Sequence, residues 1–230
     1  LEPKEEELIS NQMEVILVAA KKEKINDYTG LILEAGLNPV VVDVDGFALQ
    51  NAFELNNTIE ENVVTALINI GASLTNINIL KGNISHFTRD ISIGGNRYTE
   101  AIQKELQVGY RQADILKMGA TMAGFSPGKI TPIMLAVTKD LVQEINRSFE
   151  FFRSASTNLD IHKIVLSGGC ACIKGIDRFV SDTLSIPTEI MNHFVCMKIS
   201  TKQFDQDYLQ DMGPIAAVAV GLAIRRKFDR

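Results

Sequence analysis

Residues 63–95 read VVTALINIGASLTNINILKGNISHFTRDISIGG and predict three consecutive strands followed by a helix. The opening apolar run ends at Gly71, which is typical of a buried strand. Isoleucines alternate with asparagines over 75–80, as in a strand with one exposed face. The chain then runs back over 84–93 and reaches Gly94-Gly95, where we expect a helix to begin. The run therefore predicts an antiparallel meander that leads into a helix.

The residues before this run alternate between strand and helix patterns. Short apolar runs at 15–20 and 39–44 are typical of strands that are buried on both faces. Helical spacing of apolar residues follows each of them, over 22–35 and over 47–55. A strand–helix–strand–helix order is typical of a parallel sheet with covering helices, so we expect an α/β fold.

The residues after the run predict an insertion and then more elements of the same kind. Glycine and proline recur in a small insertion expected around 107–138. A long amphipathic helix is expected over 134–153, a strand over 163–167 and a helix over 176–184. A proline in its first turn and basic residues near its end predict a final helix over 211–226.

Composition excludes several classes of protein. The chain has 230 residues, of which 46% are hydrophobic and 22% charged, so it can bury a core and is not a disordered chain. A net charge of −5 argues against nucleic-acid binding. The longest apolar stretch, 214–224, is shorter than the roughly 20 residues that a bilayer span needs, so no membrane insertion is expected. Three cysteines suggest a reducing cytoplasm rather than a disulfide framework.

Three chain reversals share one design, in which a strand ends and glycine bares the backbone. They lie at 69–75, 93–99 and 166–175. Phosphate oxygens and a flat base need a close approach to backbone, which a Cβ would obstruct, and free N–H groups at a turn bind anions. A tight strand–helix turn explains any one reversal, but the three in this order predict peptide N–H groups that converge on one nucleotide.

These reversals resemble motifs of the actin-like ATPase superfamily, which includes actin, the Hsp70 nucleotide domain and FtsA. The hairpin 69–75 is similar to its second phosphate motif, and Gly94-Gly95 to the glycine pair of Hsp70-type sites. Residues 166–175 are similar to the adenosine motif and 213–223 to the closing connecting helix. The resemblance implies an actin-like (ribonuclease H-like) α/β fold of mixed sheets covered by helices.

Within that superfamily the chain resembles the PilM family of type IV pilus assembly proteins over nearly its whole length. The similar stretches are 14–23, 34–45, 87–95 and 144–152. The resemblance implies a remnant of a first lobe over 1–56 (subdomain 1A and the end of 1C) and a second lobe, 2A, over 57–230. The insertion at 107–138 would be a small 2B-like subdomain. It also implies a cytoplasmic scaffold, peripheral to the inner membrane, that binds ATP or ADP with Mg²⁺ and docks the amino-terminal cytoplasmic tail of a PilN-like inner-membrane protein, alongside other pilus assembly proteins.

The chain departs from the superfamily pattern in two places. The first phosphate motif, an early strand–turn–strand, is absent, so the chain is expected to begin inside or just after subdomain 1C. Asn69 stands where the superfamily usually has an aspartate that helps to hold hydrated Mg²⁺, and an amide brings no charge to that position. Both departures argue against the weak ATPase activity that the resemblance otherwise implies.

The resemblance also assigns roles to individual residues. Ser73 and Thr75 could donate hydroxyls near phosphate, and Glu144 and Arg147 could meet the ribose and the base, because three-residue spacing puts them on one helix face. Ala171 and Ile173 would shape the base pocket. No catalytic set is expected; Asn69 is the metal position, and the nucleotide-binding residues are Asn69, Gly71, Ser73, Thr75, Gly94, Gly95, Glu144, Arg147, Gly168, Gly169 and Ile173.

Three other interpretations stay open. An FtsA-like relative would act in cell division, and a module that has lost its nucleotide would only bridge partners. Cys170-x-Cys172 with His193-x-x-Cys196 could offer zinc ligands, although the glycine-rich pattern already explains the first pair.

Overall fold

The computed structural model describes residues 17–156, 159–195, 197–199 and 204–225. The chain divides into two compact units, Leu1–Val42 and Asp43–Arg230. The boundary therefore lies before helix α3 (Asp45–Asn56), because that helix packs against elements of the larger unit. The sequence placed the boundary after this helix, at 56/57.

In the smaller unit the described residues form one helix, α2 (Lys22–Glu34), which buries none of its side chains. The strand predicted at 39–44 is wrong: these residues pair with no strand, and Val40 and Val42 are exposed. A strand needs a neighbour for its N–H and C=O groups, and no described residue provides one here. Of the strand predicted at 15–20, residues 15 and 16 lie outside the described residues, and 17–20 are not a strand.

The larger unit is built on a five-stranded mixed sheet in the order β3-β2-β1-β4-β5. Strands β1 (Val64–Ile70), β2 (Thr75–Lys81) and β3 (Ile84–Ile91) form the predicted antiparallel meander. Strand β4 (Lys163–Ser167) lies parallel to β1, so the two strands end at the same edge of the sheet. The short β5 (Thr188–Ile190), which the sequence analysis did not predict, extends the sheet in parallel beyond β4.

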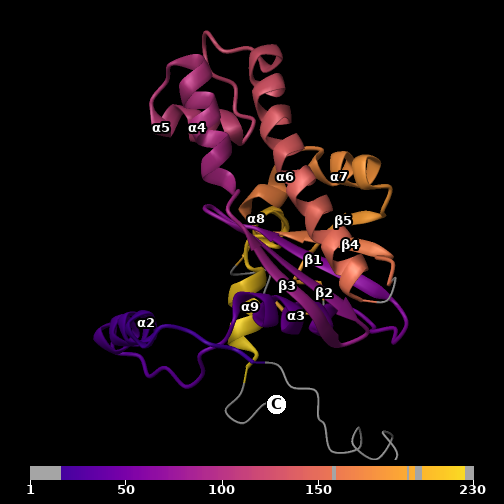
Figure 1. Cartoon of the computed structure of the whole chain (residues 1–230). Helices are drawn as coiled ribbons and strands as arrows, with labels where there is room; N and C mark the ends of the chain where they lie inside the picture. Colours follow the sequence, from indigo (N-terminus) through magenta and orange to yellow (C-terminus); the bar gives the residue numbers. More distant parts are fainter. Residues whose placement is uncertain (1–16, 157–158, 196, 200–203, 226–230) are drawn as a thin grey trace, which may run out of the picture. The chain divides into compact units, whose positions relative to one another are not determined.

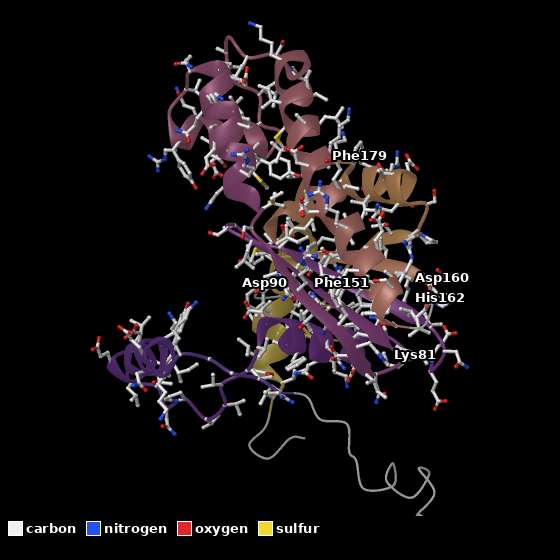
Figure 2. The ribbon with its side chains drawn as sticks, viewed as in Figure 1. Lys81, Asp90, Phe151, Asp160, His162 and Phe179 are labelled. Atoms are coloured by element: carbon white, nitrogen blue, oxygen red, sulfur yellow. The ribbon has the colours of Figure 1, made fainter. Side chains whose placement is uncertain are left out.

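Helices α6 (Pro127–Ala155) and α7 (Ile176–Leu184) cover one face of this sheet (Figure 1). Phe149 and Phe152 of α6 are fully buried there and belong to the main apolar core. At the edge of the same face, the Phe87 ring of β3 lies 5.9 Å from the ring of Phe151, which is labelled in Figure 2. Helix α6 begins before the predicted residue 134, because Pro127 starts it favourably and Pro132 still lies within its first two turns.

Helices α3 and α9 (Ala217–Ala223) cover the opposite face of the sheet (Figure 1). The final helix predicted over 211–226 is instead two helices, α8 (Gln206–Met212) and α9, with turns between them. Pro214 lies in this interruption and contributes a backbone acceptor to the site described below. Residues 226–230 lie outside the described part of the chain.

The insertion expected around 107–138 folds as a small helical layer of its own. It consists of α5 (Tyr110–Lys117) and the first turns of α6, packed against α4 (Gly95–Leu106). Ile102, Ala113 and Leu116 form its separate apolar cluster. Figure 1 shows this layer beyond the end of the sheet at which β1 ends.

Candidate functional site

The three glycine turns meet at the edge of the sheet where β1 and β4 end. The amide of Gly95 donates to the carbonyl of Gly71 over 2.9 Å, and the amide of Asn96 donates to that of Ala72 over 2.7 Å. The third turn follows β4, the parallel neighbour of β1. There, a Cβ added to Gly168 would lie 2.4 Å from the carbonyl oxygen of Ile70. The predicted convergence of the three turns is therefore confirmed.

Glycine is required at two of these positions because backbone packs directly on backbone. A Cβ on Gly94 would lie 2.7 Å from the carbonyl oxygens of both Gly71 and Ala72. Gly168 has φ +87°, in the region that side chains disfavour, in addition to its close approach to Ile70. Gly169 differs, because a Cβ there would meet nothing within 4 Å. Of these glycines, Gly169 is the one that faces open space.

Most of the glycine N–H groups are not bare. The amides of Gly71 and Gly95 donate to carbonyls of the first turn, and that of Gly168 donates to Pro214 over 2.8 Å. Among the residues that the structure describes, the amides of Ala72, Ser73, Gly94 and Gly169 have no hydrogen-bond partner. The donors that remain for an anion thus lie beside the packed glycines rather than on all of them.

Asn69 lies at the centre of this edge, where β1 ends opposite Ser167 of β4. The Ser167 hydroxyl donates to Oδ1 of Asn69 over 3.3 Å, and the same Oδ1 would lie 2.8 Å from a Cβ on Gly168. The side-chain oxygen is therefore held between the two strands. No described residue accepts from the Asn69 side-chain NH₂ group, which remains available as a donor.

The two predicted hydroxyl donors differ in access. Ser73 is exposed, and its Oγ lies 3.3 Å from the side-chain nitrogen of Asn96, which donates to it. Thr75 is fully buried, and its hydroxyl donates to the carbonyl of Ile93 over 2.7 Å. A ligand could meet Ser73 directly, whereas Thr75 holds the first turn against the second.

Lys117 of α5 is a candidate site residue that the sequence analysis missed. Its Nζ lies 2.6 Å from Asp114, 3.1 Å from the Thr99 hydroxyl and 3.7 Å from a Cβ placed on Gly95. Its side chain is only 11% exposed, so this charge is held at the turns. The available signal was the three-residue spacing of Asp114 and Lys117 on a predicted helix.

Cys170 fills the space between the second and third turns. Its Sγ would lie 2.9 Å from a Cβ on Gly95. Burial raises the pKa of its thiol to about 11, although nearby Lys117 acts in the opposite direction. Cys170 is therefore a neutral packing residue at this edge.

A hollow of about 330 Å³ opens between the helical layer and the third turn. Ile173 and Lys117 line it, together with Phe125, Ile130 and Met134 of the helical layer. Ile173, which the resemblance implied would shape a base pocket, is thus one of the lining residues of a hollow. An apolar hollow next to a cluster of backbone donors is the arrangement expected of a small-molecule site.

Glu144 and Arg147 lie elsewhere on α6. They form an ion pair with each other. Arg147 lines a separate hollow of about 510 Å³ between α6 and α7, and no glycine of the three turns lines that hollow. The structure thus brings together the glycines, Asn69 and Ser73, and Ile173 of the third turn lines the neighbouring hollow, whereas Arg147 lines neither that hollow nor the turns.

The donor set at this edge does not fit a metal ion. No group of three or more His, Cys, Asp or Glu side chains in the described ranges is placed to hold one. The carboxylate of Asp114 is already paired with Lys117, and those of Glu100 and Asp140 line a separate hollow with Ser73 and Gly94. Of the four residues considered for zinc, Cys196 lies outside the described residues.

The part of the chain that the structure describes contains no helix with the length and apolar character that crossing a bilayer requires.

Comparisons with known proteins agree with the fold. The profile of the family described as type IV pilus assembly protein PilM matches residues 3–227. A solved structure described as the PilM–PilN type IV pilus biogenesis complex superimposes with a TM-score of 0.80 at 30% identity. That match covers 91% of this chain and 60% of that chain, so the present chain spans somewhat over half the length of its relative.

Two more distant structures show the same fold. The ethanolamine utilization protein EutJ from Carboxydothermus hydrogenoformans matches with a TM-score of 0.63 at 15% identity, over 91% of this chain and 63% of that chain. MreB5 of Spiroplasma citri, solved bound to ADP, matches with a TM-score of 0.61 at 17% identity, over 90% of this chain and 65% of that chain. The fold is therefore actin-like, as the resemblance implied, and the chain belongs to the PilM family of type IV pilus assembly proteins.

Proposed function

We propose that this chain supplies the second-lobe half of a nucleotide site in a type IV pilus assembly scaffold, which binds ATP or ADP. The observation that carries the proposal is the convergence of three turns beside an apolar hollow, with Lys117 where the two meet. A phosphate chain needs donors and a base needs an apolar slot, and here the two are adjacent.

The geometry suggests an orientation for the nucleotide. Its phosphates would lie against the free amides of Ala72, Ser73 and Gly169. Its base would enter the hollow that Ile173 lines. Lys117 and Asp114, which lie between these two regions, would then meet the sugar. The Mg²⁺ that the resemblance implies has no ligand set in the described residues, so no role for it enters this proposal.

The proposed partner is the cytoplasmic tail of a PilN-like inner-membrane protein. Support comes from the family match and from the relative whose structure is described as a PilM–PilN complex. Such a scaffold would be cytoplasmic and would reach the inner membrane through that partner. If nucleotide changes the affinity for the tail, linkage requires that the tail change the affinity for nucleotide by the same factor.

Calorimetry with ADP and with ATP tests the nucleotide site, using the full-length natural polypeptide that contains these 230 residues. Gly169→Leu is the informative variant, because a Cβ there meets no protein atom within 4 Å and the larger side chain would enter the proposed phosphate region. We expect it to weaken binding by at least about tenfold while leaving the melting temperature unchanged.

Gly109→Leu is the matched control. A Cβ at Gly109 also meets nothing within 4 Å, but this residue precedes α5 and does not line the hollow. Unchanged affinity in Gly169→Leu, or equal losses in both variants, would count against this placement of the site.

A further inference from the structure

The phosphate edge of the proposed site consists of hydrogen-bond donors. Two kinds of donor are present: the free backbone amides of Ala72, Ser73 and Gly169, and the side-chain NH₂ group of Asn69. Donors of this kind bind phosphate oxygens directly. A divalent cation needs oxygen ligands instead, and it favours carboxylates.

The side-chain oxygens of Asn69, Asp114 and Thr75 are already engaged. Oδ1 of Asn69 accepts from Ser167 over 3.3 Å and is wedged against Gly168. The carboxylate of Asp114 is 2.6 Å from the Lys117 ammonium, which neutralises it. Thr75 has its hydroxyl directed to Ile93. The oxygens of Asn69 and Thr75 are thus engaged, and the charge of the Asp114 carboxylate is already balanced by an ammonium group.

We infer that this chain binds its nucleotide without a divalent metal and that the Asn69 side-chain amide donates directly to a phosphate oxygen in place of a metal bridge. The inference rests on the proposed nucleotide site and specifies its chemistry. With Oδ1 accepting from the Ser167 hydroxyl, the NH₂ group has no acceptor among the described residues and is available to a phosphate oxygen. Asn69 is thus a binding residue. Because its amide is neutral and can donate to phosphate, no metal ion is needed between the two.

The inference predicts that an aspartate at position 69 behaves differently from asparagine, although the two side chains have nearly the same shape. A carboxylate would repel a phosphate at this position unless a cation lay between them. Ser167 could still donate to one carboxylate oxygen, so Asn69→Asp should fold normally. The substitution therefore changes the charge at the phosphate edge with little change in packing.

The experiment measures the affinity for ADP by calorimetry in excess EDTA and in excess Mg²⁺, for the natural protein and for Asn69→Asp. The natural protein should bind at least as tightly in EDTA as in Mg²⁺. Asn69→Asp should lose about tenfold in EDTA, because a fixed negative charge faces the phosphate, and Mg²⁺ should restore most of that loss. Thermal melts of both proteins establish that each is folded.

Asn83→Asp is the control for the added charge. Asn83 is exposed in the turn that follows Lys81, at the far end of β2 from the glycine turns (Figure 2 labels Lys81). The ADP affinity of the Asn83→Asp variant should match that of the natural protein in both buffers.

The outcomes distinguish the two proposals. ADP binding that requires Mg²⁺ in the natural protein would overturn the metal-free inference and leave the nucleotide site standing. Equal affinity of Asn69→Asp and the natural protein in EDTA would show that Asn69 does not contact phosphate. No ADP or ATP binding in either buffer would overturn the proposed nucleotide site, and this inference with it.

Discussion

Helix α9 crosses α3 at backbone contact: a Cβ added to Gly221 would lie 1.7 Å from the carbonyl oxygen of Ala48. Both residues are buried, and the crossing seals the face of the sheet opposite to α6. No side chain fits between the two helices at this point. The crossing therefore fixes how closely the last described helix approaches the first helix of the larger unit.

Replacing Gly221 by alanine should destabilise the larger unit strongly. The added methyl group must push α9 away from α3, because its neighbours are backbone atoms that cannot rotate aside. Overpacking of this kind costs about 3 kcal/mol of unfolding free energy. Urea denaturation followed by circular dichroism measures the change. Gly128→Ala in α6 is the control, since the nearest atom there is 4.0 Å away, and no loss is expected. Equal stabilities of the two variants would contradict the tight crossing.

Asp43, at the start of the larger unit, pairs with Arg225, two residues after the end of α9. Their side chains are 2.7 Å apart, and that of Asp43 is only 6% exposed. Asp43→Asn should cost about 1–3 kcal/mol of unfolding free energy, because Arg225 loses its charged partner while remaining 23% exposed to water. Glu100→Gln is the control: its pair with Arg97 is 3.9 Å long and exposed, and its loss should cost less than about 0.5 kcal/mol.

The meander was predictable because its signal is local. Apolar runs, alternation and the glycine pair all lie within 63–95, and β1, β2 and β3 follow them. The strand expected at 39–44 failed because a strand depends on a neighbour that the sequence pattern does not specify. The break between α8 and α9 depends on Pro214, whose carbonyl accepts from Gly168, a contact between residues far apart in the chain.

The candidate site was predictable in part for the same reason. Glycines at strand ends are visible in the sequence, so the convergence of the turns could be inferred. That most of their amides are already bonded could not be inferred, because the acceptors come from other turns. Lys117 reaches the site through the fold of the helical layer, and Thr75 turns inward to Ile93, neither of which follows from spacing alone.

His193 should make the stability of the protein fall in mild acid. It is fully buried, and neither ring nitrogen has a hydrogen-bond partner. Burial lowers the pKa of its imidazole to about 4, against a smaller opposing effect of the Ala52 backbone. The unfolded chain, with a pKa near 6.5, binds this proton more readily.

The sign of the effect follows from linkage. Between pH 6.5 and 4 the unfolded state holds more protons, so stability is full above 6.5 and is lost as the pH falls. The loss attributable to His193 should be about 3 kcal/mol by pH 4. Urea titrations at several pH values should show a shallower decline in His193→Phe than in the natural protein. His86→Gln, at an exposed position on β3, should leave the decline unchanged. Parallel declines in all three proteins would contradict a buried neutral His193.

Lys117 should contribute to nucleotide affinity through its position between the turns and the hollow. Lys117→Met removes the charge but keeps most of the apolar stem, so it should weaken ADP binding by about tenfold, measured by calorimetry.

The single variant also leaves Asp114 unpaired beside the phosphate region. Asp114→Asn combined with Lys117→Met removes that carboxylate and should recover part of the lost affinity. Lys104→Met, on the exposed side of α4, is the control and should bind ADP normally. If Lys117→Met binds ADP as tightly as Lys104→Met, the nucleotide does not approach this end of α5, and the proposed orientation of its sugar is wrong.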